Sequence, residues 1–232
     1  MSSDNGAGFL ISGGIMLGQM NKTKPGLEIK DLHYISYQEA YKIQMETVQA
    51  VIQGHPNTIL LCEHPLVVTL GRIATEENIR ALPQEIEKRG GQIVRIDRGG
   101  EVTLHCPGQI VVYPIFNLNH YGRDLKDFLE KLEQVGIDLL HDFDILARRI
   151  SGQRGIWVGD KKIISIGIGV KKWVSYHGLA INVNTDLSLF SLIRPCGLDV
   201  HMTSMSELSG KIIHMTDVKL KLIHYFAQYF QL

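Results

Sequence analysis

The apolar runs on either side of Gly159-Asp160 limit the possible folds of this chain more than any other feature of its sequence. Residues 155–158 and 162–170 flank this dipeptide, and a further apolar run follows at residues 173–183. Glycine followed by aspartate between two apolar runs is typical of a tight hairpin turn. Because strands joined by short turns pair as antiparallel neighbours, we predict a mixed or mostly antiparallel sheet.

Amphipathic stretches predict the helices that flank this sheet. Ser36 and Glu39 form a capping-box pattern at the start of a helix that ends near Gly54. Apolar residues recur at helical spacing between residues 125 and 135, and the more polar stretch 75–89 also predicts a helix. Strands joined by hairpins, with helices placed around them, indicate an α+β fold in which one domain has its central sheet flanked by helices.

Length and charge favour one globular domain and exclude two classes of partner. The chain has 232 residues, and 44% of them are hydrophobic, which is sufficient for one sizeable core. Lysine plus arginine and aspartate plus glutamate both number 24, so no overall positive field attracts nucleic acid or an anionic membrane. Every apolar run is shorter than the roughly 20 residues that span a bilayer. We therefore expect neither nucleic acid nor a membrane as a partner.

The N-terminal segment and the cysteines indicate the compartment. Residues 1–26 are rich in Gly, Ser and Asn and lack the basic start and apolar middle of a secretory signal, so we expect a disordered tail. Cys62, Cys106 and Cys196 are too few and too scattered for a disulfide framework. Because reduced thiols are typical of the cytoplasm, we expect a cytoplasmic protein whose functional domain spans residues 27–232.

Cys196 and Lys162 are the candidates for catalysis. A cysteine with an unperturbed pKa of about 8.5 is only a few per cent thiolate near neutral pH, and an adjacent ammonium group favours the thiolate. A buried lysine can also take a proton from an attacking amine, whereas arginine cannot. We predict that Cys196 is an acyl-transfer nucleophile assisted by Lys162, and we assign Lys161 to the solvated hairpin tip. A buried, inert Cys196 is the alternative.

The chain also resembles the lipoyl(octanoyl) transferases. Seven segments match that family in order and spacing across nearly the whole chain, and they are residues 63–65, 69–72, 98–105, 107–109, 162–167, 177–183 and 195–197. The resemblance implies a fold of the biotin and lipoate protein ligase type, with residues 27–232 as a catalytic acyltransferase domain. It implies transfer of octanoyl or lipoyl groups in protein lipoylation, through an acyl-cysteine, without a cofactor. The implied partners are octanoyl-acyl carrier protein, the lipoyl domains of oxo-acid dehydrogenases and the glycine cleavage H protein.

The same resemblance assigns substrate binding to three segments that line the cavity in family members. The matching residues are Arg98, Gly99, Gly100, Glu101, Val102, Thr103, Leu104, His105, Ser165, Ile166, Gly167, Gly178, Leu179 and Ala180. The imidazoles of His105 and His177 can serve as bases or can order their surroundings, and we favour the orienting role for both. His64 lacks a second ligand at metal-binding spacing, so we predict no metal.

Cys106 departs from the family pattern, which has glycine at this position. If the position needs a positive φ, cysteine introduces strain into the cavity wall. A disulfide between Cys106 and Cys196 under oxidation is a further possibility that we disfavour.

Three other functions compete with the transferase. An ATP-using lipoate ligase is disfavoured because the chain has no phosphate-binding glycine motif. Such a ligase would also leave Cys196 without a role. An amidotransferase that moves octanoyl between lipoyl domains also needs a cysteine, so it stays open. A non-catalytic acyl-carrier binding module is disfavoured because Cys196 and Lys162 are both present.

The candidate contacts to acidic carrier proteins are Arg72, Arg98 and Arg194.

Overall fold

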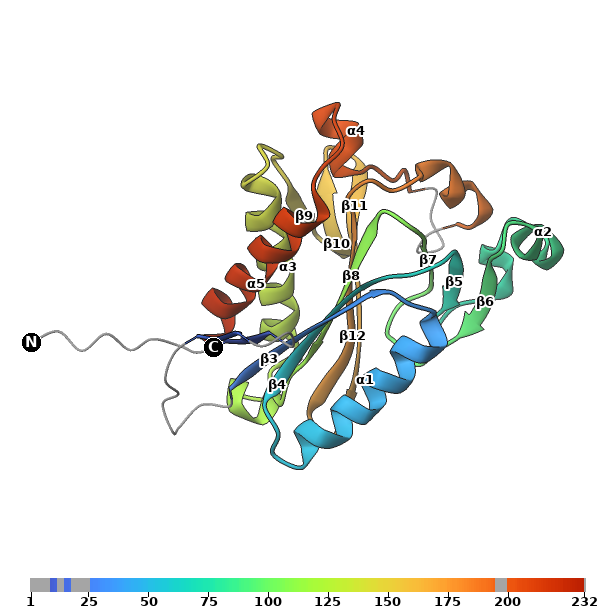
Figure 1. Ribbon diagram of the computed structural model, residues 1–232. Coiled ribbons are helices and arrows are strands. Elements are labelled where there is room, and N and C mark those ends of the chain that lie inside the picture. Colours follow the sequence, from blue (N-terminus) through green and yellow to red (C-terminus); the bar gives the residue numbers. More distant parts are fainter. Residues whose placement is uncertain (1–8, 12–14, 18–25, 195–199, 232) are drawn as a thin grey trace, which may run out of the picture.

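The computed structural model describes residues 9–11, 15–17, 26–194 and 200–231. Within these residues, nine strands form a large sheet in the order β2-β1-β3-β4-β8-β12-β11-β10-β9 (Figure 1). The bounds of these strands are Phe9–Ile11 (β1), Ile15–Leu17 (β2), Leu27–Tyr34 (β3), Asn57–Glu63 (β4), Gln109–Ile115 (β8), Arg148–Ile150 (β9), Gln153–Val158 (β10), Lys161–Lys171 (β11) and Val174–Asn182 (β12).

A second sheet lies beside the large one. In the described part of the chain it has three strands, in the order β6-β5-β7. Its strands are Val67–Leu70 (β5), Gln92–Arg95 (β6) and Val102–His105 (β7). β5 pairs with β6 in parallel and with β7 antiparallel. Leu104 and Val68 pack in the hydrophobic cluster of this smaller sheet.

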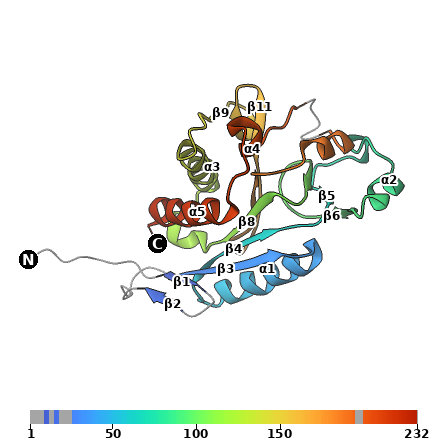
Figure 2. The same cartoon turned by 45° about the horizontal axis from the view of Figure 1, so that its top comes forward.

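Helices cover both faces of the large sheet. Helix α1 packs on one face, and α3 and α5 pack on the other (Figures 1 and 2). The helices are Tyr37–Ile52 (α1), Pro83–Lys88 (α2), Leu125–His141 (α3), Met205–Ser209 (α4) and Met215–Phe230 (α5), and the 3₁₀ segments are Glu76–Asn78, Leu118–Tyr121 and Leu187–Leu192. Each face of the sheet therefore has its own hydrophobic cluster, and the site lies on the face that α1 covers.

Strand pairing confirms the predicted fold class. β3 pairs in parallel with β1 and β4, whereas β4, β8, β12, β11, β10 and β9 pair antiparallel in succession. The sheet is therefore mixed and mostly antiparallel, and helices flank it. The predicted hairpin at Gly159-Asp160 joins β10 to β11 and places Trp157 opposite Lys162.

The two helix predictions near the N-terminal half had different outcomes. The capping box is confirmed, since Ser36 Oγ accepts a hydrogen bond from the Glu39 amide at 3.3 Å. The single helix over residues 75–89 is wrong, because this stretch contains only a 3₁₀ turn and α2. Ile79 between them forms a bridge with Ile193, which takes the backbone out of helical conformation.

The N-terminal 26 residues include two short strands. β1 pairs with β2 and with β3, so six of these residues extend the large sheet. For the remaining residues the expected tail stays a prediction. No helix in the described ranges is long and apolar enough to cross a membrane.

Candidate functional site

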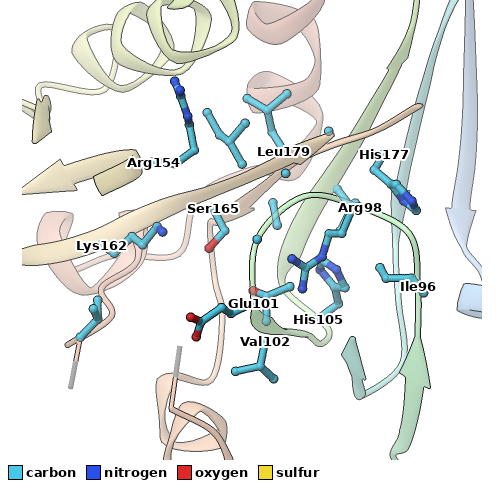
Figure 3. Close-up of a pocket in the computed structure, with 18 of the residues that line it drawn as sticks. Ile96, Arg98, Glu101, Val102, His105, Arg154, Lys162, Ser165, His177 and Leu179 are labelled. Atoms are coloured by element: carbon cyan, nitrogen blue, oxygen red, sulfur yellow. The ribbon is translucent and has the colours of Figure 1, made fainter. Parts of the chain in front are cut away.

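A cavity of about 300 Å³ lies between the large sheet and the loop that leads into β7 (Figure 3). Strands β8, β11 and β12 form its floor, and the start of α1 contributes Tyr37. The loop supplies Arg98, Gly100 and Glu101. Gly167 and Gly178 on β11 and β12 also line it, and they allow close packing, because a Cβ would lie 2.8 Å from the Gly99 carbonyl oxygen at Gly167 and 2.1 Å from the Val112 carbonyl oxygen at Gly178.

Most of the residues assigned to substrate binding line this one cavity. They are Arg98, Gly100, Glu101, Val102, Thr103, His105, Ser165, Ile166, Gly167, Gly178, Leu179 and Ala180, together with Lys162 and His177. Gly99 and Leu104 do not line it. Gly99 instead donates its amide to the Ile168 carbonyl at 2.9 Å, and the Leu104 side chain is fully buried in the smaller sheet's core.

Lys162 is held rigidly at the start of β11. Its amide donates to the His201 carbonyl at 2.8 Å, and its carbonyl accepts from the Thr203 amide at 3.0 Å. The side chain is 3% exposed, and Nζ lies 5.4 Å from the centre of the Trp157 ring. The indole face stabilises a cation at this distance. A buried amine therefore lies against one end of the cavity.

Glycine at position 155 makes room for the Lys162 side chain. A Cβ at Gly155 would lie 2.5 Å from Lys162 Cε and 2.5 Å from the Ile164 carbonyl oxygen. Gly155 also has a φ of +114°, a conformation that side chains rarely adopt. The position of the lysine thus depends on a residue in the neighbouring strand.

Three polar groups face one space at this end of the cavity. Figure 3 shows the Lys162 amine, the Ser165 hydroxyl and the Glu101 carboxylate directed toward the same space. The predicted nucleophile, Cys196, lies outside the described residues. Its proximity to Lys162 therefore stays a prediction.

The Arg98 side chain links the loop that forms the cavity wall to strand β5. One guanidinium nitrogen donates to the Thr69 carbonyl at 2.9 Å and to its Oγ1 at 3.1 Å, and the other donates to the Gly99 carbonyl at 3.1 Å. Because Arg98 is only 8% exposed, it cannot contribute to a surface that binds a carrier protein. The prediction of that contact is wrong for Arg98, whereas Arg72 and Arg194 are exposed.

His105 is fixed in one tautomer by Gln109. The Gln109 amide nitrogen donates to Asn182 Oδ1 at 2.9 Å, so its oxygen accepts from His105 Nδ1 at 2.7 Å. Burial lowers the pKa of His105 to about 3. A neutral imidazole with so low a pKa is a weak base, which favours the orienting role.

His177 joins the cavity to a network that contains Asp97. His177 Nε2 donates to Asp97 Oδ1 at 2.9 Å, and the Tyr176 hydroxyl donates to Asp97 Oδ2 at 2.6 Å. The hydrogen bond from His177 holds the pKa of the Asp97 carboxyl well below its usual range. His177 has a φ of +55°, and its amide donates to Gln44 Oε1 at 3.0 Å. The network ties the loop before Arg98 to β12.

Three buried histidines should make the protein less stable in acid. Burial lowers the pKa of His64, His105 and His177, so below about pH 6.5 the unfolded chain binds more protons than the folded chain. Stability then rises with pH across this range and falls as pH drops. Urea unfolding at about pH 5.5 and pH 7.5 measures this difference, and equal stability at the two values would contradict the assignment.

Cys106 causes none of the strain considered for a cysteine at this position. Cys106 is not one of the described non-glycine residues that have a positive φ. Its side chain is fully buried beside the smaller sheet, and burial raises the pKa of its thiol to about 12. Cys106 is therefore an inert core residue. The disulfide between Cys106 and Cys196 that we disfavour would involve a residue outside the described ranges, so its absence stays a prediction.

Sequence reasoning missed several residues of the site. Tyr37, Trp157 and Arg154 line the cavity, and Asp97 anchors its wall. Only Asp97 left a signal, since it directly precedes the predicted wall segment.

His64 packs against a histidine ring and not in a cluster of metal ligands. The rings of His64 and His105 meet edge to face with their centres 5.8 Å apart. Among the described residues, no group of three or more His, Cys, Asp or Glu is arranged to hold a metal.

Comparison with known proteins gives the family of this chain. Residues 36–227 match the model of the lipoyl protein ligase A/B catalytic domain. An octanoyltransferase of Syntrophobacter fumaroxidans is 42% identical over 203 residues, which cover 87% of this chain and 89% of the relative. An octanoyltransferase of Syntrophotalea carbinolica is 43% identical over 202 residues, which cover 86% of this chain and 92% of the relative.

Solved structures support the fold independently. A structure from the archaeal lipoylation system of Thermoplasma acidophilum, with a bi-partite lipoate protein ligase and its E2 lipoyl domain, aligns with a TM-score of 0.68. The alignment covers 90% of this chain and 84% of that chain at 15% identity, so it bears on the fold alone. From the family match and the two relatives, the chain belongs to the lipoyl protein ligase A/B catalytic domain family.

Proposed function

We propose that this chain is an octanoyltransferase that passes an octanoyl group from acyl carrier protein to a lysine of lipoyl domains, through an acyl-Cys196 intermediate. The observation that carries the proposal is the buried Lys162 amine at one end of the cavity. Glycine, alanine and aliphatic residues, among them Gly167, Ala180 and Leu179, line the cavity beside aromatic and polar side chains, and they suit an alkyl chain. The two relatives compared above bear the name octanoyltransferase.

The chain on either side of Cys196 supports its part in the reaction. Val200, four residues later, lines the cavity. Arg194, two residues earlier, donates its amide to the Asn78 carbonyl at 2.7 Å, and the Asn78 side chain binds Glu101 at the cavity. These contacts bring the described residues on either side of Cys196 to the cavity, which supports the proposal that Cys196 acts there.

In the first half-reaction, the Cys196 thiolate attacks the thioester carbonyl of the octanoyl carrier. A sulfur–carbon bond to Cys196 forms, and the bond to the carrier sulfur breaks. The Lys162 ammonium stabilises the Cys196 thiolate before attack, and its proton then goes to the departing carrier thiolate. The products are octanoyl-Cys196, the free carrier thiol and a neutral Lys162 amine.

In the second half-reaction, the ε-ammonium of the acceptor lysine gives one proton to the neutral Lys162 amine. The acceptor amine attacks the acyl-cysteine, a carbon–nitrogen bond forms, and the bond to Cys196 sulfur breaks. The amide nitrogen loses its second proton to the departing thiolate, and the Cys196 thiol then releases this proton to solvent, which restores the thiolate and the Lys162 ammonium that begin the cycle. Thioester cleavage drives amide formation, so the cycle needs neither a nucleotide nor another cofactor.

The partners follow from these two half-reactions. Octanoyl-acyl carrier protein is the donor, and the lipoyl domains of oxo-acid dehydrogenases and the glycine cleavage H protein are the acceptors. The exposed Arg72 and Arg194 are the candidate contacts for these carriers. Residues 27–232 form the catalytic domain, and the reaction belongs in the cytoplasm, where acyl carrier protein operates.

An assay with alternative donors separates this function from its rivals. Octanoyl carrier protein and an octanoylated lipoyl domain are each offered as sole donor to an unmodified lipoyl domain, without ATP. Octanoylation from the carrier protein supports the transferase, and octanoylation from the other lipoyl domain alone would make the chain an amidotransferase. A requirement for ATP and free octanoate would make it a ligase, and no modification with any donor would favour a binding module.

A further inference from the structure

Glu101 supplies negative charge to a cavity that otherwise carries cations. It is the only carboxylate among the described residues that line the cavity, which also include Arg98, Arg154 and Lys162. The residue is held in place by two contacts. Asn78 Nδ2 donates to Glu101 Oε2 at 3.0 Å, and the Gly71 amide donates to the Glu101 carbonyl at 3.0 Å. The carboxylate is therefore positioned by its surroundings.

The Glu101 carboxylate remains available to an incoming cation. It forms no ion pair with any described residue, and its side chain is half-buried at the end of the cavity that contains Lys162. Figure 3 shows it directed into the space that the Lys162 amine and the Ser165 hydroxyl also face. A positioned carboxylate with a free oxygen is well suited to accept a charge-assisted hydrogen bond.

The two substrates of the proposed function differ in charge at the reacting group. The octanoyl chain and its thioester are neutral, whereas the ε-amine of an acceptor lysine is an ammonium ion near neutral pH. We propose that Glu101 binds this ε-ammonium group and holds it beside Lys162 until it gives up its proton. This inference rests on the proposed function and assigns Glu101 to its second half-reaction.

The division of labour between Glu101 and Lys162 follows from their charges. A neutral Lys162 amine can accept a proton but gives an incoming cation little attraction. The Glu101 carboxylate attracts the cation and, through its bond with Asn78, fixes where the nitrogen lies. After the proton has moved, the acceptor nitrogen has a lone pair and remains near the acyl group, where proximity favours attack.

Glu101→Gln tests the assignment, because it removes the charge and keeps the shape and the hydrogen bond from Asn78. We expect the KM for the lipoyl domain to rise about tenfold, whereas the rate of acyl-enzyme formation from octanoyl carrier protein changes less than about twofold. Glu101→Asp should recover most of the affinity. Glu87→Gln, which removes an exposed carboxylate of α2 that does not line the cavity, is the matched control and should match the wild type.

Hydroxylamine distinguishes a charge effect from a distorted site. It is a small nucleophile that is neutral near pH 7, so it should release octanohydroxamate from the acyl-enzymes of the wild type and Glu101→Gln at the same rate. An unchanged KM for the lipoyl domain in Glu101→Gln would overturn the inference, as would an equal loss with hydroxylamine. Failure of the proposed function itself is seen separately, as an absence of octanoyl transfer by the wild type.

Discussion

Replacement of Lys162 by arginine should reduce octanoyl transfer to lipoyl domains by about 10²- to 10⁴-fold, the usual loss when a general base is removed. Arginine keeps the positive charge, so it can still stabilise a thiolate, but it does not lose its proton in proteins. Its bulkier head group must also fit against Trp157, where the lysine is 3% exposed. Single-turnover transfer from isolated acyl-enzyme measures the effect.

Lys161→Arg is the matched control for this variant. Lys161 is the preceding residue, its side chain is 45% exposed, and it pairs with Glu207 at 3.5 Å. The change should leave transfer within about twofold of the wild type, because exposed ion pairs contribute little. Full turnover by Lys162→Arg would remove the proton-transfer role of Lys162 and would leave it a purely electrostatic one.

Replacement of Gly155 by alanine should displace Lys162 and reduce transfer by about 100-fold, since small misplacements of a reacting group have effects of this size. The added methyl group would lie 2.5 Å from Lys162 Cε and from the Ile164 carbonyl oxygen, so the lysine must move. The positive φ of +114° adds strain of about 1–3 kcal/mol. Thermal unfolding and single-turnover transfer report the two effects.

Gly159→Ala separates the strain from the displacement. Gly159 has a φ of +60° in the same hairpin, and no atom lies within 4 Å of the position that its Cβ would take. This variant should lose about 1–3 kcal/mol of stability through backbone strain and retain wild-type transfer. Equal transfer by the Gly155 and Gly159 variants would show that the Gly155 contact does not control the position of Lys162.

Local patterns in the sequence were sufficient to predict the parts of the fold that depend on neighbouring residues. The Gly159-Asp160 turn sets the register that places Trp157 opposite Lys162, and Ser36 with Glu39 begins α1. The stretch 75–89 failed because its conformation depends on a distant partner, Ile193, that pairs with its middle. Helical periodicity carries no information about such a contact.

The site shows the same limit. Family motifs were sufficient to predict which residues line the cavity. They could not reveal that the Arg98 side chain is buried, or that Asp97 binds His177, which lies 80 positions away in the sequence. Both facts depend on how the smaller sheet lies against the large one. Strain at Cys106 was likewise conditional on a backbone angle, and that angle is determined by packing.

The intact mass of the protein after incubation with octanoyl carrier protein tests the central claim most directly. The account predicts that the wild type gains the mass of one octanoyl group, that Cys196→Ala gains none, and that the wild-type adduct disappears when a lipoyl domain is added. A wild type that transfers octanoyl without ever carrying it, or an adduct that persists in Cys196→Ala, would contradict the account.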